Sequence, residues 1–173
     1  MKTEFLLLSL AQLILSIGVG VIVLYVTYYL THKVFEKKKY KLTNDNIAFG
    51  IFLSALLFSV GLIVYASIKP SSALVNIMGG MENKTEMFFS FMKYLLLFIS
   101  IGVLVSAFVI LISLMLFNFL TKKVKELEQI SKGNISVALI TAVIIIVISM
   151  FAKDSVSLIV ESLMPYPEMN IIF

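Results

Sequence analysis

Four long apolar runs alternate with short polar segments along the chain. They extend from Phe5 to about Thr31, from Asn46 to Ile68, from Met87 to Leu120 and from Ile135 to Ala152. An α-helix needs roughly 18 or more apolar residues to cross a bilayer, and each run is long enough. The first run is too long for the hydrophobic part of a signal peptide, so we expect a retained span. The pattern predicts an all-α membrane protein with four transmembrane helices.

The polar segments between these runs contain a repeated motif. YLTHKVFE at residues 29–36 resembles FLTKKVKE at residues 119–126, and Asn46-Ile47-Ala48 resembles Asn134-Ile135-Ser136. A repeat of this kind predicts two copies of one supersecondary unit. We expect two helical hairpins, residues 1–80 and 81–173. Each copy crosses the membrane twice in the same sense, so the copies are parallel repeats about an axis along the membrane normal.

The repeat extends beyond the hairpins. Lys69-Pro70 and the residues after it align with Lys153-Asp154 and its following residues. In the second copy, apolar positions between about residues 155 and 164 share one helical face. We therefore expect each hairpin to be followed by a short amphipathic helix on the outer membrane surface.

Composition supports a membrane location. Apolar residues make up 60% of the chain and charged residues 14%, whereas a soluble domain is about half apolar and a quarter charged. Nine of the fourteen basic residues, all of them lysines, lie in the two polar turns that follow the first and third runs: Lys33, Lys37, Lys38, Lys39, Lys41, Lys122, Lys123, Lys125 and Lys132. By the positive-inside rule, both turns are cytoplasmic and both termini lie outside.

The lysine turns suggest a partner. Lysines beside a membrane attract anionic lipids, by about 1 kcal/mol per residue. Nucleic acid is a less suitable partner, because its recognition favours the arginine fork and the chain has no arginine. The chain also contains no cysteine, and its single histidine, His32, is expected to be an interfacial side chain rather than a metal ligand.

The interior of the predicted spans contains no Asp, Glu or Lys. Proton relays, ion-coupled transport and intramembrane catalysis need ionisable groups at that depth. The polar turns contain no glycine-rich phosphate loop and no acid–base pair. We therefore expect a protein that is not an enzyme and has no cofactor or metal.

Small residues recur in the spans. The glycines are Gly18, Gly20, Gly50, Gly61 and Gly102, and Gly18 aligns with Gly102 in the repeat. Glycine lets membrane helices approach closely. Packing within one chain is the favoured interpretation, and a subunit interface or a pore lining is the alternative.

Asn46 and Asn134 are the most clearly repeated polar positions. Each stands where a span begins, so each is expected to cap a helix N-terminus. The alternative is a pair of amides that face each other across the repeat axis at a cytoplasmic pore mouth.

These motifs also carry a family resemblance. Asn46-Ile47-Ala48 and Gly133-Asn134-Ile135-Ser136-Val137-Ala138, each opening a span after a polar turn, resemble the YjfL-like bacterial inner-membrane family, a tandem two-span repeat of unknown function. The resemblance implies a bacterial-type plasma membrane location, no established activity and a link to envelope stress or polyamines. It supplies no catalytic residues.

Together, these features predict an oligomeric membrane scaffold or envelope-stress-linked component. A homo-oligomer is expected, with an unidentified cytosolic or membrane protein as a further partner. The alternative is an ion or small-solute pore whose lumen forms at an oligomer axis and is lined by serine, threonine, glycine and the repeated asparagines.

Overall fold

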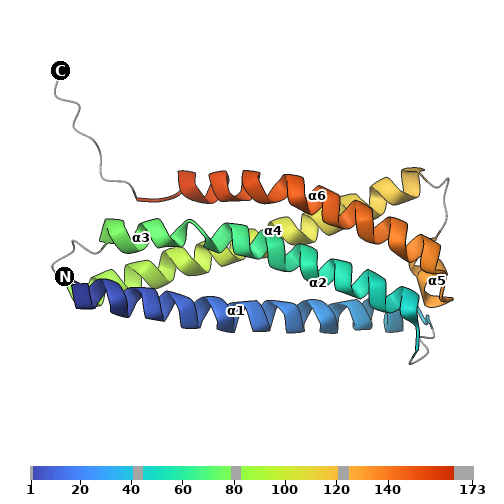
Figure 1. The fold of residues 1–173 in the computed structure, drawn as a ribbon, viewed down its shortest axis with the longest axis horizontal. Helices are drawn as coiled ribbons and strands as arrows, with labels where there is room; N and C mark the ends of the chain where they lie inside the picture. The colour runs from blue at the N-terminus through green and yellow to red at the C-terminus, as the bar shows by residue number, and fades with distance from the viewer. Residues whose placement is uncertain (1, 41–44, 79–82, 121–124, 166–173) are drawn as a thin grey trace, which may run out of the picture.

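The computed structural model describes residues 2–40, 45–78, 83–120 and 125–165, and all regular elements in these ranges are α-helices (Figure 1). They are α1 (Lys2–Lys37), α2 (Ile47–Ile68), α3 (Ser71–Met78), α4 (Lys84–Leu120), α5 (Glu126–Ser131) and α6 (Ile135–Ser162). Four segments are long and apolar enough to cross a membrane: α1, α2 together with α3, α4, and α6. A helix satisfies its own backbone polar groups, which lipid cannot do. The predicted all-α architecture with four candidate spans is confirmed.

The long helices alternate in direction. α1 and α4 run from one end of the bundle to the other, and α2 and α6 return (Figure 1). The last turn of α1, the first turns of α2 and α6, and α5 therefore lie together. We call this the lysine-rich end, since its described lysines are Lys33, Lys37, Lys38, Lys39, Lys125 and Lys132. The start of α4, α3 and the last turns of α6 lie at the opposite end.

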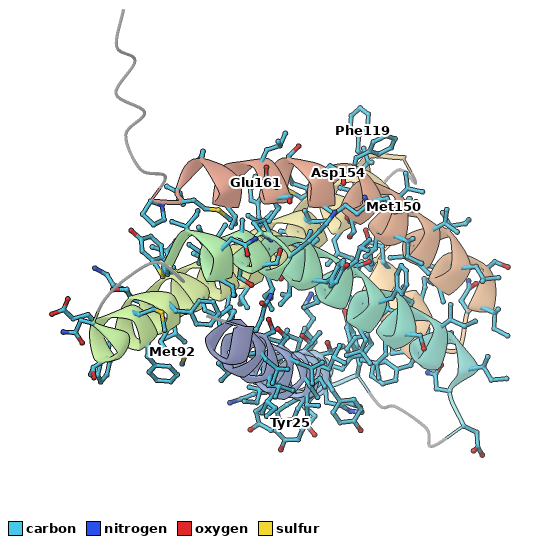
Figure 2. The ribbon with its side chains drawn as sticks, turned by 60° about the vertical axis from the view of Figure 1, so that its left-hand side comes forward. Tyr25, Met92, Phe119, Met150, Asp154 and Glu161 are labelled. Carbon is cyan, nitrogen blue, oxygen red and sulfur yellow. The ribbon has the colours of Figure 1, made fainter. Side chains whose placement is uncertain are left out.

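α2 is the central helix and α1 is peripheral. α2 packs against α6, α4 and α1, whereas α1 packs mainly against α2 and α3. In the most apolar stretch of each span, 50% of the residues are buried for the α2–α3 segment and 0% for α1. Tyr25 points away from the bundle on the free side of α1 (Figure 2). In a bilayer this side faces lipid.

Two apolar clusters hold the bundle together. One, nearer the opposite end, joins α2, α3, α4 and α6 around Ile63, Leu74, Phe91, Phe98 and Val160. The other, nearer the lysine-rich end, joins the last turns of α1 to α2, α5 and α6. Through the second cluster, the end of α1 packs against the rest of the bundle, although most of α1 is peripheral.

α1 is longer than expected at its lysine-rich end. It continues to Lys37, so Lys33 and Lys37 lie on a helix and not in a turn. Lysine is a good helix former, and its positive charge is favourable near a helix C-terminus. The polar residues after the apolar run therefore extend the helix beyond the hydrophobic segment.

The two hairpins differ at the opposite end. In the first hairpin, α2 ends at Ile68 and α3 begins at Ser71, because Pro70 has no N–H and its ring clashes with the carbonyl four residues earlier. In the second hairpin Asp154 stands at the position that the sequence comparison aligns with Pro70, and α6 continues through it to Ser162. The expectation of a separate amphipathic helix at residues 155–164 was therefore wrong. Residues 155–162 form the last turns of the spanning helix.

α4 is one uninterrupted helix of 37 residues. At 1.5 Å per residue it reaches about 55 Å, against roughly 30 Å of hydrocarbon. A helix of this length is longer than a perpendicular crossing of the hydrocarbon requires.

Candidate functional site at the lysine-rich end

Both lysine segments meet at one end of the bundle. Lys33, Lys37, Lys38 and Lys39 come from the end of α1, and Lys125 and Lys132 flank α5 (Figure 1). Lys41, Lys122 and Lys123, which the sequence also places in these turns, lie outside the described residues. The described lysines thus lie at the same end of the bundle.

α1 ends in a left-handed turn at Lys39. Its φ angle is 56°, which is costly for a residue with a side chain. The Lys39 N–H donates to the Glu36 carbonyl (2.8 Å), and the Tyr40 N–H donates to the Phe35 carbonyl (3.1 Å). This pair of bonds is a Schellman motif, which satisfies carbonyls left unpaired at the helix end.

α5 ends in the same way at Gly133, whose φ angle is 82°. The Gly133 N–H donates to the Ile130 carbonyl (3.0 Å), and the Asn134 N–H donates to the Gln129 carbonyl (3.0 Å). Each basic segment therefore ends with a Schellman motif before the next long helix.

Asn46 caps α2 and also binds α5. Its Oδ1 accepts a hydrogen bond from the Phe49 N–H at 2.9 Å, which satisfies one free donor of the first turn. Its Nδ2 donates to the carbonyls of Ile130 and Ser131, both at 3.0 Å. These carbonyls belong to the last residues of α5, so one side chain serves the start of one helix and the end of another. Asn46 joins the two hairpins.

Asn134 performs only the local part of this role. Its Oδ1 accepts from the Val137 N–H at 3.2 Å, and its Nδ2 donates to Gln129 Oε1 at 3.3 Å. Within the described part of the chain, no hydrogen bond joins Asn46 to Asn134. Each amide caps the helix that follows it.

Aromatic side chains from the end of α1 pack against Phe49, in the first turn of α2 that Asn46 caps. Phe35, at 1% exposure, packs edge-to-face against Phe49 with ring centroids 5.0 Å apart. His32 stands between Tyr28 and Phe49, with centroid distances of 4.5 and 4.9 Å. His32 is a packing residue here, and no group of three His, Asp or Glu side chains within the described ranges is arranged to hold a metal ion.

Glu126 is a buried carboxylate that the sequence did not reveal. Only 6% of the residue is exposed, and Oε1 has no hydrogen-bond partner among the described residues. Burial raises the pKa of Glu126, opposed by the Glu126 backbone N–H and by the charge of Lys38. One feature of the sequence could have indicated this burial: Glu126 stands four residues before the apolar Ile130, which places both on one face of a helix. The lysine-rich motif at residues 119–126 instead predicts a basic turn where α5 begins, so Glu126 was expected to be exposed.

Glu128, on the exposed side of α5, behaves differently. Its Oε1 pairs with Lys132 Nζ at 2.7 Å, and this hydrogen bond lowers the pKa of Glu128. The pair is solvent-exposed, so it adds little stability.

The five glycines fall into different environments. A Cβ at Gly102 would lie 2.3 Å from Ser67 Oγ and 3.2 Å from the Val64 Cα, whereas one at Gly61 would be 3.9 Å from Leu24. At Gly18, Gly20 and Gly50 it would meet nothing within 4 Å. Gly102 is the position at which α4 and α2 approach too closely for any side chain.

The chain matches the family model described as Domain of Unknown Function (DUF350) over residues 5–156. This stretch includes most of α1, all of α2 to α5 and most of α6. The chain belongs to the DUF350 family. Neither the comparison with curated proteins nor that with solved structures gave a match. The family places this chain among proteins of unknown activity, so its role has to be argued from the site itself.

Proposed function

We propose that this DUF350 protein is a non-enzymatic membrane scaffold that assembles as a homo-oligomer. It consists of two parallel hairpin repeats joined at a cytoplasmic platform of lysines. The observation that carries the proposal is the bridge from Asn46 to the last carbonyls of α5. This bridge joins α5, with its flanking lysines, to the start of α2, and Phe35 near the lysine-bearing end of α1 packs in the same apolar cluster.

The orientation follows from the same surface. Lysines near the ends of spans favour the cytoplasmic side of a bacterial-type plasma membrane. The start of α1 and the end of α6 then lie outside. On the cytoplasmic side the lysines contact anionic lipid and are available to an unidentified cytosolic or membrane protein partner.

Open small residues on α2 support self-association. A Cβ added at Gly50 would meet no atom within 4 Å, and Ser54, one turn later, is exposed. Small residues at this spacing allow a helix of a second copy to approach closely. This supports α2 as part of the subunit interface.

A pore is supported less well by the positions of the spanning hydroxyl groups. Ser106, Ser113, Thr141 and Ser149 are buried inside the bundle. Their hydroxyls donate to carbonyls of their own helices at 2.7–2.8 Å. Because these side chains are buried within one chain, they are not exposed to a lumen between subunits.

Native mass spectrometry of the purified protein tests the scaffold. We expect an oligomer that Gly50→Leu dissociates, while Val143→Leu, at an exposed position on α6, leaves it intact. A monomeric wild-type protein would overturn the oligomeric scaffold. In liposomes we expect no solute or ion flux, and a reproducible conductance would favour the pore instead.

A further inference from the structure

A groove of about 620 Å³ lies between α1 and α4, with α2 as its floor. Ile22, Val26 and Leu30 of α1 face Val103, Ile110 and Leu114 of α4 across it. The groove exists because α1 packs on α2 and α3 but barely on α4. Its volume is within the roughly 300–1,000 Å³ typical of small-molecule sites.

The walls of the groove are suited to an apolar occupant. Hydroxyl groups are present, but they are already used: Thr27 donates to the Val23 carbonyl at 2.8 Å and Thr31 donates to the Thr27 carbonyl at 2.7 Å. The Ser106 hydroxyl donates to the Val103 carbonyl at 2.8 Å. A polar solute would lose its hydration in this groove without gaining hydrogen-bond donors in return.

One end of the groove is charged. Lys38, just after α1, is the charged residue of the lining, beside Leu127 of α5. The charge of Lys38 also acts on Glu126 of α5, where it lowers the pKa that burial raises. Lys37 and Lys39 flank Lys38 in the sequence. The groove is thus apolar along its length and positive at its interfacial end.

The length of the groove matches one leaflet. From Ile22 to Val34 it follows α1 for about 18 Å. Half of the hydrocarbon thickness is about 15 Å. An occupant with its charged group at Lys38 would therefore have its apolar part within a single leaflet.

We propose that this groove binds an anionic phospholipid, with an acyl chain between α1 and α4 and the phosphate at Lys38. Charge complementarity selects an anionic over a zwitterionic headgroup, and the leaflet containing the lysine-rich end supplies the lipid. A helix of a second copy would fill the apolar part but would leave the charge of Lys38 unused. The site does not depend on the scaffold role, because it needs one chain only.

Brominated lipids can test the site because the chain has no native tryptophan. Leu30→Trp, at a position 53% exposed, reports on the groove, and Ile140→Trp, 52% exposed on α6, is the matched control near the same membrane interface. Each variant is reconstituted in vesicles with brominated phosphatidylglycerol or brominated phosphatidylcholine. The relative lipid binding constant is obtained from the quenching of tryptophan fluorescence.

We expect a preference of about fivefold for phosphatidylglycerol at Leu30→Trp, the amount that one interfacial lysine provides, and a markedly weaker preference at Ile140→Trp. Adding Lys38→Gln should abolish the preference at Leu30→Trp, whereas adding Lys37→Gln should preserve most of it.

Equal quenching by both lipids at Leu30→Trp would show ordinary annular lipid and overturn the proposal. Absence of quenching would show that protein covers the groove, and a preference that survives Lys38→Gln would also refute the site. Circular dichroism confirms that each variant is folded.

Discussion

Asn46 and Asn134 are both helix N-caps, but their roles differ. Both asparagines have extended backbones and both accept from the N–H three residues later. Only Asn46 also donates to two carbonyls of α5. A cap is local and follows from the sequence, whereas the second set of bonds depends on which element lies opposite.

Replacing each asparagine with alanine should separate the two roles. Losing a cap costs about 1 kcal/mol, and each additional hydrogen bond contributes about 1 kcal/mol. We therefore expect Asn46→Ala to lose about 2–3 kcal/mol of stability and Asn134→Ala about 1 kcal/mol, as measured by denaturant unfolding in detergent. Asn46→Ser, which keeps the capping oxygen, should give an intermediate loss. Equal losses at the two positions would contradict the bridge.

Glu126 predicts a pH dependence of stability. Because burial raises its pKa above the ordinary value of 4.5, the folded state holds the proton more tightly than the unfolded state. Stability should therefore fall as the pH rises from 4.5 through the raised pKa of the folded protein. Glu126→Gln should remove this part of the slope, whereas Glu128→Gln should not. The check is the unfolding temperature measured between about pH 4 and pH 8, and an unchanged slope in Glu126→Gln would contradict it.

At the scale of the elements, positions that align in the sequences of the two hairpins differ in their surroundings. Pro70 interrupts the first copy where Asp154 continues the second. Gly102 is in close contact with Ser67 of α2, whereas its aligned partner Gly18 lies on the open side of α1. The cause is the position of each helix, since α4 packs against both α2 and α6 while α1 lies at the edge.

Alanine at the two aligned glycines should act in opposite directions. Gly102→Ala forces α4 away from the α2 backbone and should lose about 1–3 kcal/mol. Gly18→Ala meets no neighbour and should gain up to about 1 kcal/mol through helix propensity. Thermal unfolding in detergent measures both. Ser67→Gly combined with Gly102→Ala should recover part of the loss, and a neutral Gly102→Ala would contradict the close approach.

For the whole molecule, the arrangement in Figure 1 predicts which residues share a side of the membrane. The chain has no cysteine, so single-cysteine variants give an unambiguous signal. Lys37→Cys and Lys132→Cys should react with an impermeant thiol reagent from one side, and Ser72→Cys and Ser162→Cys from the other. In cells we expect the lysine pair to be labelled only after the membrane is permeabilised. Labelling of Lys37→Cys and Lys132→Cys from different sides would refute the bundle topology.

Much of the fold could be predicted because it depends on local chemistry. A long apolar run has to form a helix in lipid, since lipid offers no partners for free backbone groups. The asparagine caps likewise depend only on residues within one turn. The extension of α1 through its lysines was missed, although lysine is a good helix former. The continuation of α6 past Asp154 was missed as well, because an aspartate, unlike a proline, keeps its backbone N–H and does not break a helix.

The sequence by itself determined the four apolar helices, their alternation with basic segments and the caps at Asn46 and Asn134. The tertiary structure decided that Asn46 reaches α5, that Glu126 is buried, that Gly102 carries a close contact and that α1 stands apart from α4 to leave a groove. These features depend on residues far apart in the chain. Each reflects a choice among packing arrangements that the hydrophobic pattern leaves equally acceptable, because lipid accommodates an apolar helix on any face.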